Sequence, residues 1–160
     1  MSVMARGCGI VLLLVLTLMG GLATDAPAQD DKLRTYNKNP IIISGQIRLA
    51  REQEQRAMEL IGAAAGDPAT LEQTKAIVYD AYVLIRAALG GVRMVQGNSK
   101  FPDPTLPIQI DLMEKARGDL RGCLTDLDRV RIGQIERLEP ARAYLESSMA
   151  TLSSVALLLP

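Results

Sequence analysis

Apolar side chains recur at helical spacing along most of the chain after residue 40. The broadest apolar surface belongs to residues 71–96, where isoleucine, leucine, valine and alanine return every three or four positions. Only a narrow strip of this stretch is polar. A helix with so wide an apolar surface is normally covered by two or more neighbours. The pattern therefore predicts the central helix of a small bundle.

Two further stretches carry the same helical pattern. Residues 41–65 present one apolar stripe, and a second stripe begins at Thr105 or Leu106 and runs to Val130. The segment 66–70, Gly-Asp-Pro-Ala-Thr, separates the first two helices. We expect Pro68 in a first turn and a capping box formed by Thr70 and Gln73. So short a connection makes the two helices antiparallel.

The region after Val130 leaves two architectures open. Its apolar positions continue the phase of the preceding helix to Ala156, yet Gly133 and Pro140 both disfavour an uninterrupted helix. We favour a turn between residues 131 and 140 and a fourth helix that folds back and covers residues 71–96. The alternative is three helices, the last one long and kinked at Pro140, which would overhang and need a dimer partner. In both cases the fold class is all-α, a small antiparallel helical bundle.

Residues 1–28 have the pattern of a secretory signal peptide. Arg6 is followed by the apolar run 10–19, and Ala26 and Ala28 supply the small residues of a cleavage site. We expect cleavage after Ala28, with cleavage after Ala23 as the alternative. The apolar run is shorter than the roughly 20 residues that span a bilayer, which disfavours an uncleaved anchor. We therefore expect a periplasmic or secreted protein with a flexible arm at 29–40, a bundle domain at 41–160 and no stable membrane span.

Composition excludes several functional classes. The chain has 18 basic and 18 acidic residues, so no charge excess favours nucleic acid, and we expect none as a partner. It has no histidine, which removes the commonest general base and the commonest zinc ligand. We assign no cofactor, no metal and no catalytic residue. Signal cleavage would leave Cys123 as a single thiol on an apolar helix face, which indicates a buried and inert cysteine.

Glu54 interrupts the apolar stripe of residues 41–65, and Asp80 lies about ten residues into the next helix. At about 1.5 Å rise per residue, an antiparallel hairpin brings the two carboxylates to nearly the same height. Two carboxylates at one level can bind a cation or share a proton. The alternatives are that Glu54 turns to solvent or pairs with an arginine, of which Arg117 on the third helix is the nearest.

The polar strip of residues 71–96 is a second candidate for ligand binding. It contains Tyr79, Tyr82, Arg86 and Arg93, which could stack on and pair with an anionic or planar ligand. Such a strip is also the ordinary solvent-facing edge of a buried helix, with tyrosine hydroxyl groups reaching water.

We favour a non-enzymatic interaction or adaptor module of the cell envelope, with another envelope protein or a second copy as its partner. The apolar C-terminal residues 155–159 either pack in the core or dock to that partner. The alternative function is a small-ligand or cation-binding bundle that uses Glu54, Asp80 and nearby arginines. A third hypothesis is an enzyme that relies on carboxylate acid–base chemistry and arginine electrostatics.

Overall fold

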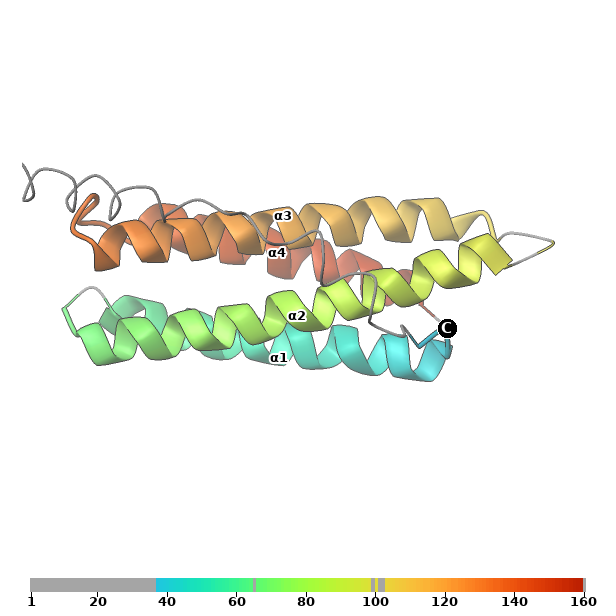
Figure 1. The fold of residues 1–160 in the computed structure, drawn as a ribbon, viewed down its shortest axis with the longest axis horizontal. Coiled ribbons are helices and arrows are strands. Elements are labelled where there is room, and N and C mark those ends of the chain that lie inside the picture. The colour runs from blue at the N-terminus through green and yellow to red at the C-terminus, as the bar shows by residue number, and fades with distance from the viewer. Residues whose placement is uncertain (1–36, 65, 99, 101–102, 160) are drawn as a thin grey trace, which may run out of the picture. The chain divides into compact units, whose positions relative to one another are not determined.

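The computed structural model describes residues 37–64, 66–98, 100 and 103–159, and every regular element in these ranges is helical. The elements are α1 (Pro40–Ala64), α2 (Pro68–Asn98), α3 (Thr105–Arg131) and α4 (Glu139–Leu158). Successive helices run in opposite directions (Figure 1). The predicted all-α antiparallel bundle with four helices is therefore confirmed. The predictions for residues 1–36, including the signal peptide, lie outside the described residues.

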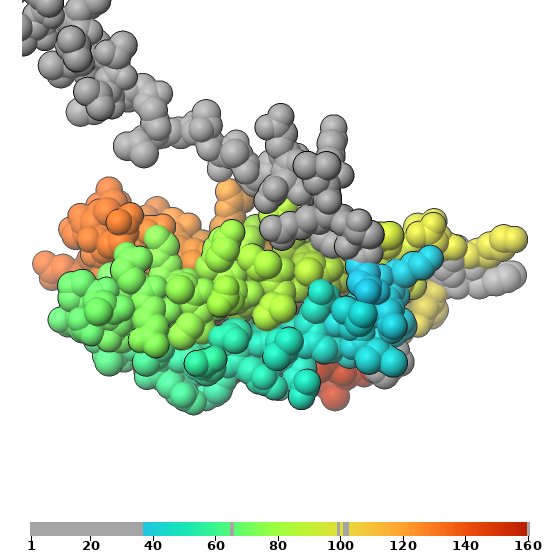
Figure 2. Space-filling view, turned by 60° about the horizontal axis from the view of Figure 1, so that its bottom comes forward, coloured from blue at the N-terminus to red at the C-terminus, as the bar shows by residue number. Residues whose placement is uncertain are grey.

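The four helices form a closed ring of neighbours. α1 packs against α2 and α4, and α3 packs against α2 and α4. Figure 2 shows α1 and α2 side by side on one face. Our expectation that the fourth helix covers α2 was wrong. The physical reason is that α1 and α3 already occupy both sides of α2, so that α4 fills the remaining position between α3 and α1.

Every helix contributes fully buried apolar side chains to one core. The largest of them are Ile47, Ile85, Leu89, Met113, Leu120, Leu127, Leu145 and Leu152. Burial of each such side chain stabilises the fold by roughly 1.5–3 kcal/mol relative to exposure. Cys123 lies in this core and is fully buried, as its position on the apolar face of α3 predicted.

Asp67, and not Thr70, caps the start of α2. The two carboxylate oxygens of Asp67 accept hydrogen bonds from the backbone amides of Ala69 and Thr70, each at 3.1 Å. The Thr70 hydroxyl group donates to the same carboxylate, so it is not the cap. Pro68 occupies the first turn, as expected, because its missing N–H is not needed there. The predicted Thr70–Gln73 capping box was wrong because the helix begins two residues earlier.

A turn at residues 132–138 separates α3 from α4. Gly133 adopts φ 72°, a left-handed conformation that glycine reaches without a Cβ clash, and its amide donates to the Val130 carbonyl at 3.0 Å. Pro140 stands in the first turn of α4, where its ring is tolerated. The single long helix kinked at Pro140 is therefore contradicted. No helix within the described ranges is long and apolar enough to cross a membrane.

Candidate functional site

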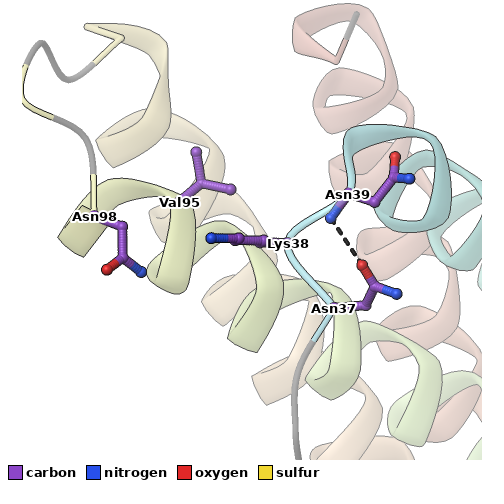
Figure 3. A pocket seen from close by; sticks show the side chains of 5 residues that line it. All are labelled: Asn37, Lys38, Asn39, Val95 and Asn98. Carbon is purple, nitrogen blue, oxygen red and sulfur yellow. Dashed lines mark hydrogen bonds between the residues drawn. The ribbon is translucent and has the colours of Figure 1, made fainter.

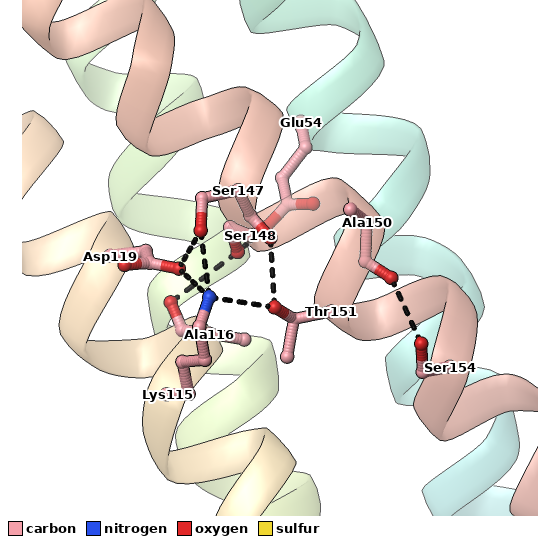
Figure 4. A network of polar contacts seen from close by, with 9 residues as sticks. All are labelled: Glu54, Lys115, Ala116, Asp119, Ser147, Ser148, Ala150, Thr151 and Ser154. Carbon is pink, nitrogen blue, oxygen red and sulfur yellow. Dashed lines mark hydrogen bonds and ion pairs between the residues drawn. The ribbon is translucent and has the colours of Figure 1, made fainter.

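Glu54 is the one buried acidic residue at the centre of the α1 stripe, and its side chain is 0% exposed. Its Oε1 atom and Ser148 Oγ on α4 lie 2.6 Å apart and are hydrogen-bonded to each other. The same Ser148 Oγ lies 3.3 Å from the backbone carbonyl of Ala116 on α3. Figure 4 shows these three residues converging from α1, α3 and α4. The carboxyl group therefore joins three of the four helices.

Burial raises the pKa of Glu54 from 4.5 to about 7, because the charged form would lose its hydration. The hydrogen bond from Ser148 and the positive charge of Arg51 oppose this rise, and the negative charge of Asp119 adds to it. The second carboxyl oxygen, Oε2, has no hydrogen-bond partner among the described residues. The expectation that Glu54 turns to solvent is therefore not met.

Asp80 does not share the surroundings of Glu54. It is exposed on α2, whereas the Glu54 carboxyl group faces α3 and α4 inside the core. The hairpin register addresses only the height of the two residues along the bundle and leaves the direction of each side chain open. No group of three or more His, Cys, Asp or Glu side chains in the described ranges could hold a metal ion.

The polar strip of α2 divides into two parts. The rings of Tyr79 and Tyr82 stack, with centroids 6.3 Å apart and planes inclined by 26°. Arg93 is ion-paired with Glu114 on α3, and Arg117 holds the same carboxylate at 2.6 Å. Two of the predicted ligand-binding arginines thus share one carboxylate across the α2–α3 contact, which lowers their capacity to bind an anion.

Arg86, the remaining arginine of the strip, is half-buried on α2. Glu54 is in the core, Asp80 is on the surface, and Arg93 and Arg117 meet at Glu114. Of the predicted site residues, the structure thus pairs the two tyrosines with each other and, separately, brings these two arginines to Glu114. It does not bring Glu54 and Asp80 together.

A second polar cluster lies on the α3–α4 surface beside Glu54. Lys115 Nζ contacts Ser147 Oγ at 2.7 Å, Asp119 Oδ2 at 3.0 Å and Thr151 Oγ1 at 3.1 Å. Ser147 in turn donates to Asp119 at 2.7 Å (Figure 4). A lysine activates a serine only as a neutral base. Lys115 is half exposed and paired with a carboxylate, so it acts as a donor, and the cluster ties α3 to α4.

The sequence analysis missed Ser148 as the partner of Glu54. The signal was present, because Ser148 lies on the same helical face as Leu145 and Leu152, at the spacing of a core position. A polar residue at a core position needs a buried partner. Which residue meets it depends on which helix packs against α4, and the apolar pattern does not contain that information.

One end of the bundle carries exposed apolar side chains. The starts of α1 and α3 and the end of α2 lie there, and α4 ends there because it runs antiparallel to both of its neighbours (Figure 1). We call the following set the apolar end: Ile41 (81% exposed), Ile42, Ile108 (52% exposed) and Leu157 (87% exposed). Within the C-terminal apolar run, Val155 is buried in the core, as one expectation had it, whereas Leu157 faces solvent.

An open hollow of about 620 Å³ adjoins the apolar end. Asn37, Asn39 and Asn98 line it together with Lys38 and Val95, and Figure 3 shows their side chains between the start of α1 and the end of α2. Another hollow, of about 210 Å³, lies between Ile61 and the α3–α4 turn. Neither hollow is lined by Glu54 or by any other predicted site residue.

No protein-family model, no curated protein and no solved structure matches this chain. The geometry and chemistry of the described residues are therefore the guide to function.

Proposed function

We propose that the protein is an exported, non-enzymatic interaction module of the cell envelope. The apolar end carries this proposal. Ile41, Ile108 and Leu157 are each more than half exposed and come from three different helices whose termini lie at the same end of the bundle. Isolated exposed apolar residues are ordinary, but several large ones around the same end of a bundle favour a surface that another molecule covers.

The polar groups in and beside the core favour a function at the protein surface over a catalytic function. Glu54 is enclosed by the core, and neither of the two hollows found among the described residues adjoins its carboxyl group, so these hollows offer no place for a substrate beside it. Ser147 and Lys115 reach the surface, but the lysine is held as a hydrogen-bond donor by Asp119. These features favour an interaction module over an enzyme.

The chemistry around the apolar end favours a protein partner. The adjoining hollow is lined by Asn37, Asn39 and Asn98 together with Lys38 and Val95. The side-chain oxygens of Asn37 and Asn39 already accept hydrogen bonds from the backbone amides of Asn39 and Ile41, which leaves the NH₂ groups of these two side chains to donate to a polypeptide backbone. An anionic membrane surface would instead attract a cluster of basic residues, and the chain carries equal numbers of basic and acidic side chains. We therefore propose that the partner is another envelope protein, one that presents apolar side chains and free backbone groups.

Site-directed photo-crosslinking in intact cells of the native host tests this proposal. A photo-reactive side chain replaces Leu157 at the apolar end or, as the matched control, Leu49, which is exposed on α1. We expect one adduct of defined mass from position 157 and none from position 49. The adduct should disappear when Ile108→Asn is added, and the identified protein, once purified, should bind the wild-type chain at least tenfold more tightly than Ile108→Asn.

Three results would contradict the proposed partner. An adduct of twice the mass of the chain would assign the apolar end to a second copy. Adducts with lipid alone would assign it to a membrane surface. Equal adduct yields from positions 157 and 49 would show that the apolar end is not a binding surface.

A further inference from the structure

The hydrogen-bonding geometry around Glu54 favours the neutral form of its carboxyl group. Ser148 Oγ is within reach of two acceptors, Glu54 Oε1 at 2.6 Å and the Ala116 carbonyl at 3.3 Å, yet a hydroxyl group has only one hydrogen. A neutral Glu54 resolves the conflict, since its carboxyl O–H donates to Ser148 and Ser148 donates to Ala116. An ionised Glu54 would take the serine hydrogen and leave a buried charge with an unpartnered Oε2.

The charged groups around Glu54 do not neutralise an ionised carboxylate. From α3, Asp119 faces it with a like charge. The Cys123 thiol on the same helix has its pKa raised mainly by burial and, to smaller extents, by Asp126 and Glu54, so it supplies no positive charge. From α4 the facing group is Ser148, which is uncharged. On α1 itself, Arg51 is exposed and attracts the carboxylate only weakly against the loss of hydration. Within the described ranges, α2 contributes no charged group that shifts Glu54.

The Glu54–Ser148 hydrogen bond crosses the seam between α1 and α4. This seam is the sparsest of the four helix contacts in the bundle. We propose that the proton on Glu54 controls this seam: the neutral carboxyl group keeps α1 and α4 together, and loss of the proton loosens them. This property is independent of the proposed partner at the apolar end.

The direction of the pH dependence follows from the raised pKa of Glu54, which lies at 4.5 in the unfolded chain and at about 7 in the folded one. Below pH 4.5 both states hold the proton, and the stabilising contribution is fully present. Between pH 4.5 and about 7 only the folded state holds it, so the unfolding constant rises about tenfold per pH unit. The rise amounts to about 300-fold in total and stops above pH 7.

Urea unfolding of the full chain between pH 4 and pH 8.5 tests this inference. Glu54→Gln keeps the shape of the side chain but cannot titrate. We expect the ratio of the wild-type unfolding constant to that of Glu54→Gln to rise about 300-fold across this range. Glu59→Gln, an exposed glutamate on the same helix, should follow the wild type at every pH. A constant ratio between the wild type and Glu54→Gln would overturn the proposal.

Cys123 reports on opening at the level of Glu54. In a Cys8→Ser background it is the single thiol, and it is fully buried. We expect its labelling rate by a neutral thiol reagent, divided by the rate in Glu54→Gln, to increase between pH 5 and pH 7 and then to level off. An unchanged ratio over this range would contradict a loosened seam.

An NMR titration of the Glu54 carboxyl carbon uses the wild-type chain, so it tests the proposal even if Glu54→Gln fails to fold. A Glu54 midpoint near 7 supports the proposal, and a midpoint near 4.5 overturns it.

Discussion

At the scale of single residues, Glu54 is the one acidic side chain in the described ranges that is 0% exposed. A polar group in an apolar core is tolerated when it is hydrogen-bonded, and an unpaired one costs about 1–3 kcal/mol. The sequence identified Glu54 as the residue that breaks the α1 stripe, because this anomaly is local. Its partner Ser148 lies 94 positions away along the chain and depends on tertiary packing.

Ser148→Ala tests the Glu54 hydrogen bond. Removing the hydroxyl group leaves the buried carboxyl group without its partner, so we expect the free energy of unfolding at pH 5 to fall by about 1–3 kcal/mol. Ser153→Ala is the matched control on α4, because among the described residues the Ser153 hydroxyl group donates to the backbone of its own helix, at Met149. It should change the free energy of unfolding by less than about 0.5 kcal/mol. Equal effects of the two substitutions would count against a specific Glu54–Ser148 contact.

Gly91→Ala tests a close approach between the start of the described chain and α2. A Cβ atom at Gly91 would lie 2.5 Å from the backbone carbonyl oxygen of Asn37 and 3.0 Å from the Ile43 side chain. We expect a loss of about 1–3 kcal/mol in urea unfolding. Gly118→Ala is the control, since nothing lies within 4 Å of its Cβ. Alanine at this exposed position of α3 should raise the free energy of unfolding by about 0.5–1 kcal/mol. A stabilising Gly91→Ala would show that Asn37 does not pack on α2.

At the scale of elements, the apolar period predicted where the helices lie to within a few residues. Glycine and proline mark both the break before Pro68 and the turn between Arg131 and Glu139. The cap of α2 was assigned to the wrong residue because Asp67 and Thr70 are both good capping types. The start of α2 at Pro68 distinguishes them, because the residue that precedes the first helical position is the cap, and that residue is Asp67.

Replacement of Asp67 tests its role as the cap of α2. Asp67→Ala should lower the urea midpoint at pH 7, because the Ala69 and Thr70 amides lose their acceptor. Hydrogen bonds from the Thr70 hydroxyl group and from the two amides lower the pKa of Asp67 below 3.8. Its stabilising contribution is therefore present above pH 3.8 and is lost as the pH falls through the lower, folded value.

The midpoint difference between the wild type and Asp67→Ala should accordingly shrink when the pH is lowered from 5 to 2.5. Asp111→Asn removes an exposed carboxylate from α3 and is the control for general charge effects. If the difference does not depend on pH, a role for the ionised Asp67 cap is ruled out.

At the scale of the whole bundle, the order of neighbours was the part that the sequence did not predict correctly. Each helix has an apolar face, but the pattern does not say which two helices cover that face. The same gap explains the outcome for the candidate site. Glu54 and Asp80 were placed by height along a hairpin, and the direction of Glu54 toward Ser148 follows from the position of α4. The exposure of Leu157 and Ile108 likewise depends on where the helices end in space.

The apolar end is the proposed binding surface, whereas Glu54 contributes to the stability of the core. The crosslinking yield from position 157 in intact cells distinguishes these two roles most directly. It is measured side by side in Glu54→Gln and in Ile108→Asn. We predict a yield close to that of the unmodified sequence at Glu54→Gln and at least a tenfold loss at Ile108→Asn, with both variants folded by circular dichroism. A loss at Glu54→Gln together with an unchanged yield at Ile108→Asn would contradict the account and return the function to the buried carboxyl group.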